Sequence, residues 1–122
     1  DKSFRIKELV GYRCGQTRGR IVAGLRTEFS NHSFGTALDI NSRTNGLYRR
    51  CDLEGRVPTS AKDIARCKKS IGGEWNPEKN RKVTITPTSK AYELLTTIVG
   101  WKWGGEIPGR TKDFMHFSVN GF

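Results

Sequence analysis

The sequence predicts one small domain that combines short strands with two helices. The chain has 122 residues, about the size of a single domain with one hydrophobic core. Apolar residues alternate with other residues over 36–41 and 114–119, as in half-buried strands, and recur with helical spacing over 88–99. Hydrophobic residues make up 34% of the chain and charged residues 28%, which excludes a disordered protein. We therefore expect residues 1–122 to form a single domain.

The N-terminal part of the chain predicts short strands separated by turns. Residues 1–10 alternate weakly between charged and apolar positions, which indicates a short strand or an opening turn. Residues 11–15 are bounded by glycines and predict a tight turn, and 15–20 predict an exposed loop. Residues 20–25 predict a second strand that Gly24 ends or bulges. Because the chain begins at Asp1 rather than Met, we expect a removed leader, a larger precursor or an upstream domain.

The segment Ser30–Asn41 contains His32, one of only two histidines in the chain. Gly35 suits a strained backbone angle, and the strand that follows alternates with a period of two. In that alternation Asp39 points away from the aliphatic side. An aspartate within a strand is disfavoured by intrinsic propensity, so we expect it to face solvent or a cation.

Residues 42–81 form a long polar insertion that is rich in glycines and basic residues. A short helix is predicted over 60–70, and an insertion of this length in a small domain indicates a functional role, such as one wall of a cleft. In an oxidising compartment Cys51 and Cys67 would close the insertion and leave Cys14 unpaired. Three reduced thiols are an equally acceptable interpretation, so the disulfide state stays open.

The C-terminal part predicts the clearest helix and the last strand. Apolar residues at 91, 94, 95, 98 and 99 give one continuous helical face, and Pro87 and Gly100 suit its two ends. We expect this helix to belong to the core. In the strand 114–119, His116 lies on the face opposite to the aliphatic residues, as Asp39 does in its own strand.

The chain is strongly basic, with 22 Lys and Arg against 12 Asp and Glu, a net charge of +10. This charge predicts attraction to an anionic polymer, which could be nucleic acid or the cell envelope. The sequence contains no apolar run near the roughly 18 residues that a transmembrane helix needs.

The two histidines and Asp39 together predict a metal site. A catalytic zinc ion commonly takes three protein ligands and leaves a fourth position for water. His32, Asp39 and His116 supply such a set, and a bound zinc ion suits hydrolysis of an amide. A single histidine would more often be structural, but two histidines that each have a nearby aspartate favour the metal. Asp113, three residues before His116, is the predicted general base.

Further residues are predicted to bind the substrate. Arg13, in its glycine-flanked turn, is the first choice for stabilising an oxyanion or a substrate carboxylate, and Arg26 is the alternative. Ser30, the first residue of the segment that contains His32 and Asp39, is also predicted to contact the substrate. Trp101 and Trp103 are candidates for lining the groove, together with Phe34 and Tyr12, although tryptophans in such positions more often belong to the core.

These segments resemble the VanY-like D-alanyl-D-alanine carboxypeptidases, a group of zinc peptidases that includes VanX-type dipeptidases and many phage endolysins. Residues 30–40 are similar to the S-x-H-x-x-G-x-A-x-D signature, and 113–117 resemble the second signature, an acidic residue, two others, His and an aromatic. The run 101–105 and the segment Gly11-Tyr12-Arg13 also look like members of the group. Asp113 stands where many members have Glu.

The resemblance implies an α+β domain with a central antiparallel sheet flanked by helices. It implies one zinc ion held by His32, Asp39 and His116, with Asp113 as general base. The implied substrate is a peptide bond in a peptidoglycan stem or cross-link, and the bond that is cut stays open between carboxypeptidase and endopeptidase action. We expect a monomer that works in the periplasm, outside the cell or at the cell wall, including delivery as a phage lysin or an interbacterial effector.

Two other functions are considered. A basic nucleic-acid-binding module or small metal-dependent nuclease would use the same charge, but the basic residues do not interleave with aromatic residues, so no specific nucleic acid is expected. A wall-binding domain that keeps zinc without activity is the third possibility. In the leading hypothesis the positive charge holds the enzyme on anionic polymers of the cell envelope.

Overall fold

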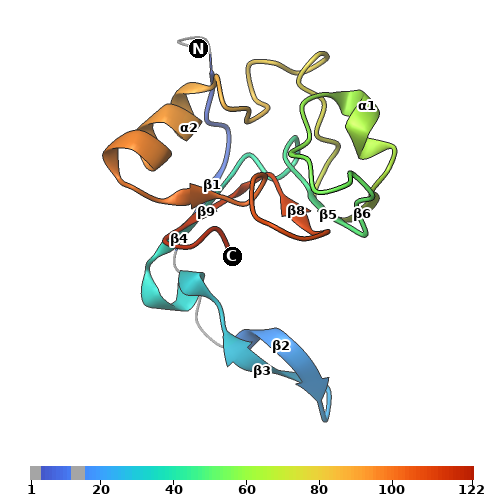
Figure 1. Ribbon diagram of the computed structural model, residues 1–122. Helices are drawn as coiled ribbons and strands as arrows, with labels where there is room; N and C mark the ends of the chain where they lie inside the picture. The colour runs from blue at the N-terminus through green and yellow to red at the C-terminus, as the bar shows by residue number, and fades with distance from the viewer. Residues whose placement is uncertain (1–3, 12–15) are drawn as a thin grey trace.

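The computed structural model describes residues 4–11 and 16–122, which form an α+β arrangement (Figure 1). Their strands pair into three small sheets that are antiparallel throughout, with short helices packed around them. The predicted α+β class is confirmed. None of the helices in these ranges is long and apolar enough to cross a membrane.

The largest sheet positions the predicted metal ligands. Its four strands, in spatial order, are β1 (Leu9–Val10), β4 (Ala37–Ile40), β9 (His116–Ser118) and β7 (Lys102–Trp103). Asp39 of β4 stands directly opposite His116 of β9. Because residues opposite each other in a sheet share a face, the two side chains emerge side by side. Both predicted strands are present, each shorter than expected at its ends.

The polar insertion is largely loop, and two of its segments form strands of a second sheet. Its strands are ordered β6 (Lys68–Ile71), β5 (Leu47–Arg49) and β8 (Lys112–Asp113), and a short helix, α1 (Ala61–Ile64), lies between β5 and β6 in the chain. The predicted helix over 60–70 is therefore too long. It ends at Ile64 because the residues that follow enter the disulfide at Cys67 and then pair with β5.

A disulfide between Cys51 and Cys67 closes the insertion at the ends of β5 and β6. This resolves the alternative that the sequence left open for these two residues, whereas Cys14 lies outside the described residues. Cys51 is buried in the core cluster, and its backbone N–H donates a hydrogen bond of 2.9 Å to the carbonyl of Arg110. The cross-link therefore also holds the loop that precedes β8.

We expect the Cys51→Ser/Cys67→Ser protein to be less stable by about 3 kcal/mol, the entropic effect of closing a loop of this length in the unfolded chain. The free energy of unfolding from urea titrations of both proteins tests this. Equal free energies and equal denaturant slopes would contradict a native disulfide.

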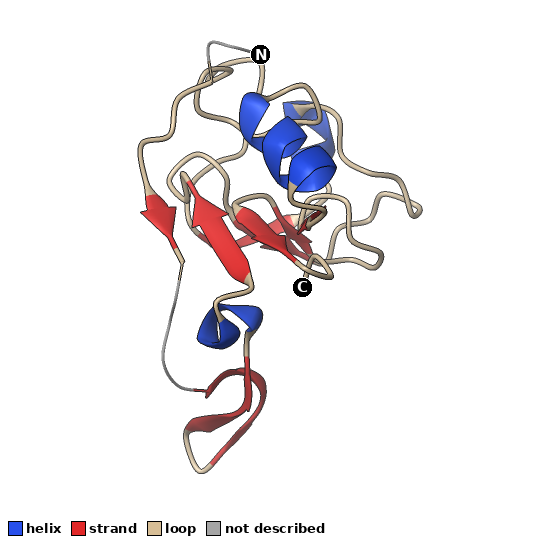
Figure 2. Cartoon of the chain, turned by 90° about the vertical axis from the view of Figure 1, so that its left-hand side faces the viewer, coloured by secondary structure: helices blue, strands red, loops and turns tan. Residues whose placement is uncertain are grey.

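A β-hairpin projects from the rest of the molecule (Figure 2). It consists of β2 (Gln16–Val22) and β3 (Leu25–Phe29), joined by Ala23 and Gly24, whose φ angles are 52° and 80°. Two consecutive positive φ angles give the turn whose twist matches an antiparallel pair. The expectation of an exposed loop over 15–20 is wrong for residues 16–20, which pair in this hairpin.

The predicted amphipathic helix is present but irregular. It begins as α2 (Lys90–Glu93) and continues as a π-helix, η2 (Leu94–Ile98). Ala91 is buried and Leu95 packs on the core, but Leu94, Ile98 and Val99 are exposed. The prediction of one continuous buried face is wrong, because the wider π-turn changes the angle between successive side chains and rotates the later ones off the core.

The core includes residues from both larger sheets, such as Phe117 of β9 and Tyr48 of β5. The rings of Trp75 and Phe114 stack with centroids 4.2 Å apart, and Trp103 packs against Phe114. Beside them the buried amide of Asn45 accepts a hydrogen bond from the backbone N–H of Ile85 and donates to the carbonyl of Val83. These contacts fix the insertion against the main sheet, which places β8 beside β9.

Candidate metal centre

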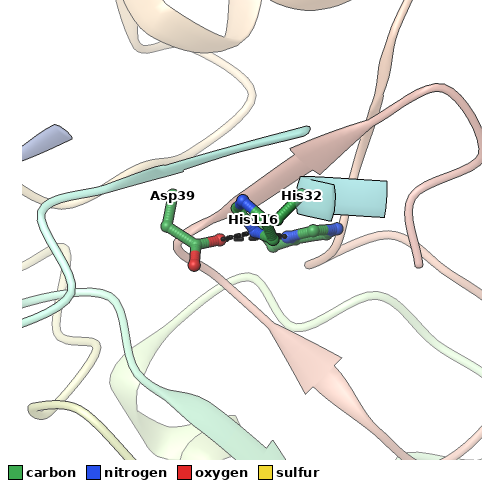
Figure 3. Close-up of side chains that lie close together, drawn as sticks. All are labelled: His32, Asp39 and His116. Atoms are coloured by element: carbon green, nitrogen blue, oxygen red, sulfur yellow. Dashed lines mark hydrogen bonds and ion pairs between the residues drawn. The ribbon is translucent and has the colours of Figure 1, made fainter. Parts of the chain in front are cut away.

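Three potential metal ligands converge in the structure (Figure 3). His32 comes from the 3-10 helix η1 (Asn31–Phe34), Asp39 from β4 and His116 from β9. Oδ1 of Asp39 lies 3.2 Å from Nε2 of His32 and 3.0 Å from Nδ1 of His116, and the two imidazole nitrogens are 3.3 Å apart. All three side chains are buried. The structure therefore brings the predicted ligand set together.

Local structure explains how His32 reaches this position. The helix η1 ends at Gly35, whose φ of 68° is left-handed and whose N–H donates to the carbonyl of His32. Glycine adopts this conformation without the steric cost of a Cβ atom. The chain can therefore reverse directly from η1 into β4, which brings His32 over the strand that carries Asp39.

Each histidine is oriented by a backbone carbonyl on its other ring nitrogen. Nδ1 of His32 lies 2.6 Å from the carbonyl oxygen of Gly11, and Nε2 of His116 lies 2.8 Å from that of Phe122. A carbonyl can only accept, so each of these nitrogens carries the proton in the neutral imidazole. The other nitrogen of each ring then presents its lone pair to the shared centre, the arrangement that metal-binding histidines use.

The charges of Asp39 and His116 stabilise each other. Burial would raise the pKa of Asp39, but hydrogen bonds from His116 and His32 outweigh burial and hold that pKa well below its usual range. Burial lowers the pKa of His116, yet its hydrogen bond with Asp39 and the nearby carboxylate of Asp113 raise it overall. Positive charge on His116 therefore stabilises the carboxylate of Asp39.

Asp113 lies in the same cavity and differs from Asp39 in its environment. Its Oδ1 is buried and has no hydrogen-bond partner among the described residues. Burial raises the pKa of Asp113 from its ordinary value of 3.8 to about 6, with His116 acting in the opposite direction. A carboxyl group with a pKa this close to neutrality can both accept and return a proton. Asp113 therefore has the properties of the predicted general base.

Among the described residues, the side chain of Ser30 is the second buried polar group without a hydrogen-bond partner. Its side chain is 5% exposed, and Oγ makes no hydrogen bond with any residue that the structure describes. Ser30 and Asp113, whose buried oxygen atoms lack partners among the described residues, both line the cavity with the three converging side chains. Buried polar atoms are rarely left unpaired in a folded protein, so this space fits a polar occupant.

The cavity, called the groove below, has a volume of about 550 Å³. Leu47, Arg49 and Ile71 of the insertion form part of its wall, which confirms the expectation that the insertion contributes to a cleft. Arg18 and Arg26 of the hairpin and the loop 107–111 line other parts. The predicted substrate-binding residues Arg26 and Ser30 thus border the groove.

The remaining predicted residues lie elsewhere. Arg13 and Tyr12 fall outside the described residues. The prediction that Trp103 contacts a substrate is corrected: its side chain is 1% exposed, and Nε1 donates to the carbonyl of Phe114. Trp101 is half-buried against the core, and neither it nor Phe34 is among the described residues that line the groove.

Gly104 is a positioning residue that sequence reasoning did not single out. Its N–H donates to the carbonyl of His116 at 2.7 Å, and its carbonyl accepts from the N–H of Asp113 at 3.0 Å. A Cβ atom at this position would lie 2.3 Å from the backbone oxygen of Asp113. Only glycine permits this approach. The pair of glycines after Trp103 indicates a close approach of the backbone at this point. The sequence does not show that the backbone partners of Gly104 are His116 and Asp113.

Comparison with known proteins finds one family whose model matches the chain. The model of a family described as D-alanyl-D-alanine carboxypeptidase matches residues 23–119. This range contains His32, Asp39, Asp113 and His116. No curated protein and no solved structure matches the chain.

Proposed function

The chain belongs to the D-alanyl-D-alanine carboxypeptidase family, whose model matches most of its length, and from this premise we propose that it is a zinc-dependent peptidase of peptidoglycan. The single observation that carries the proposal is the convergence of Nε2 of His32, Oδ1 of Asp39 and Nδ1 of His116. Two imidazoles and one carboxylate suit a catalytic zinc ion that keeps a position open.

The donor set and its surroundings support zinc binding at this centre. His32, Asp39 and His116 would hold the ion, and the carbonyls of Gly11 and Phe122 would keep both rings in the required tautomer. When bound, zinc would polarise a peptide carbonyl and lower the pKa of a water molecule from about 15.7 toward 7.

The proposed roles of the chain's own residues follow from their places around the groove. Asp113 would accept a proton from the attacking water and return it to the leaving amine. Ser30 and Arg26 would hold polar groups of the peptide next to the scissile bond. Arg13 is retained as the candidate for stabilising the oxyanion.

The proposed setting is the periplasm, the cell wall or the outside of the cell. The Cys51–Cys67 disulfide supports an oxidising compartment, and the net charge of +10 supports retention on anionic envelope polymers. The peptides of peptidoglycan are found in the same places.

Purified sacculi provide the test of this function. We expect the protein to release new amine termini from sacculi, a chelator to abolish the release, and added zinc to restore it. Mass spectrometry of the released muropeptides would identify the bond. Release that persists after chelation, and persists in His116→Ala, would refute the zinc mechanism.

A further inference from the structure

Four arginines of the described residues line the groove around the metal centre. Arg18 and Arg26 come from the hairpin, Arg49 from β5 and Arg110 from the loop before β8. Within the described ranges, the acidic residues that line it are Asp39 and Asp113, both of which are needed by the proposed chemistry. A bound divalent cation would make the groove still more positive. The four arginines therefore carry more positive charge than the two aspartates of the groove can neutralise.

Arg49 and Arg110 form a pair on the part of the wall that the insertion supplies. The N–H of Cys51, two residues after Arg49, donates to the carbonyl of Arg110 at 2.9 Å, so the two backbones lie next to each other. Arg49 also stands opposite Lys68 in the β5–β6 ladder. The disulfide that follows directly fixes this corner, so both guanidinium groups are carried by a constrained backbone.

The two guanidinium groups have no acidic partner within the described part of the chain. In contrast, Arg56 and Arg66 of the same insertion lie near Asp63 and Asp52 respectively, so the insertion does neutralise other arginines. Arg49 and Arg110 are both exposed to the groove. A planar guanidinium with free N–H groups favours a carboxylate, which it can bind through two parallel hydrogen bonds.

We propose that Arg49 and Arg110 form a subsite for a carboxylate of the substrate that lies away from the bond that is hydrolysed. This inference rests on the proposed function, since it names the class of peptide that the same groove accepts. The preferred peptide then carries a free acidic group on a residue next to the cleaved pair. Peptides whose acidic groups are amidated are poorer substrates, and Arg49 and Arg110 are specificity-determining residues.

Synthetic stem peptides test the subsite. Three peptides are compared: one with free glutamyl and diaminopimelyl carboxylates, one amidated at the first of these, and one amidated at the second. We expect the zinc-loaded wild type to cleave the free acid with a kcat/KM about 10- to 100-fold above that of one amidated peptide, the range for a lost charge-assisted hydrogen bond. The Arg49→Gln/Arg110→Gln protein should cleave all three within about threefold of one another.

The matched control is Arg43→Gln/Arg50→Gln, which removes the same charge from exposed residues that do not line the groove. It should keep the preference of the wild type. Equal cleavage of all three peptides by the wild type, or an undiminished preference in Arg49→Gln/Arg110→Gln, would overturn the subsite.

A binding measurement separates this inference from the proposed function. Zinc-loaded Asp113→Asn, with and without the two arginine substitutions, is titrated with each peptide by calorimetry. Absence of cleavage by the wild type refutes the proposed peptidase. An arginine-dependent preference for the free acid in the titration supports the subsite, and binding that ignores amidation overturns it.

Discussion

His32→Ala and Asp39→Ala are each expected to lose the bound zinc and, with it, peptidase activity by at least about 1,000-fold. Each variant leaves two ligands where the proposed site has three, and two ligands hold zinc poorly. His116→Ala should behave in the same way. Metal content per chain after purification, together with hydrolysis of sacculi, measures both effects.

Folding has to be controlled, because all three side chains are buried. Far-ultraviolet circular dichroism and thermal unfolding of the metal-free proteins show whether a variant has lost the site or the fold. Asp52→Asn serves as a matched control, since it also removes a carboxylate but its side chain is 73% exposed. A folded His32→Ala or Asp39→Ala protein that retains one zinc ion per chain would show that the ligand set is wrong.

The alternation of apolar and polar residues in the sequence could predict the part of the site that is carried by strands. The period of two put Asp39 and His116 on the polar faces of their strands, and the structure places them opposite each other. The register that aligns them was not predictable, because it results from pairing between segments 77 residues apart. His32 arrives through a 3-10 turn, which has no hydrophobic period.

Other features depend on groups that carry no sequence signal. The carbonyls of Gly11 and Phe122 orient the two imidazoles, and any residue type can provide a carbonyl. Arg49 and Arg110 could not be distinguished among 22 basic residues until the fold brought them to one groove. Trp103 was misplaced because aromatic residues suit a core and a substrate groove equally well in sequence.

Asp113→Asn is expected to separate activity from metal binding. The amide cannot accept the proton from water, so kcat/KM should fall by about 100- to 10,000-fold, the usual contribution of a general base. Zinc content should stay at the wild-type level, because Asp113 is not part of the converging ligand set. Asp113→Asn that retains wild-type kcat/KM would exclude Asp113 as the base.

The same substitution should stabilise the metal-free protein. Burial raises the folded-state pKa of Asp113 to about 6, above its ordinary value of 3.8. Below the lower value the carboxyl is protonated in both states, and its burial costs nothing electrostatically. As the pH rises from 3.8 to about 6, the unfolded chain loses the proton first, and wild-type stability is lost until the folded state ionises too.

Asparagine stays neutral throughout, so its advantage over the wild type should be near zero at pH 3, grow between pH 4 and 6, and level off above. A pKa raised to about 6 corresponds to about 3 kcal/mol at the plateau. The pKa of about 6 already includes the opposing effect of His116, so about 3 kcal/mol is the upper limit of the expected advantage. Urea unfolding of chelated Asp113→Asn and wild type at pH 3, 5 and 8 measures the difference. If the advantage of Asp113→Asn were constant with pH, Asp113 would not have this raised pKa. If the advantage follows the predicted profile, the fold tolerates an unfavourable carboxylate at the position where the reaction needs a base.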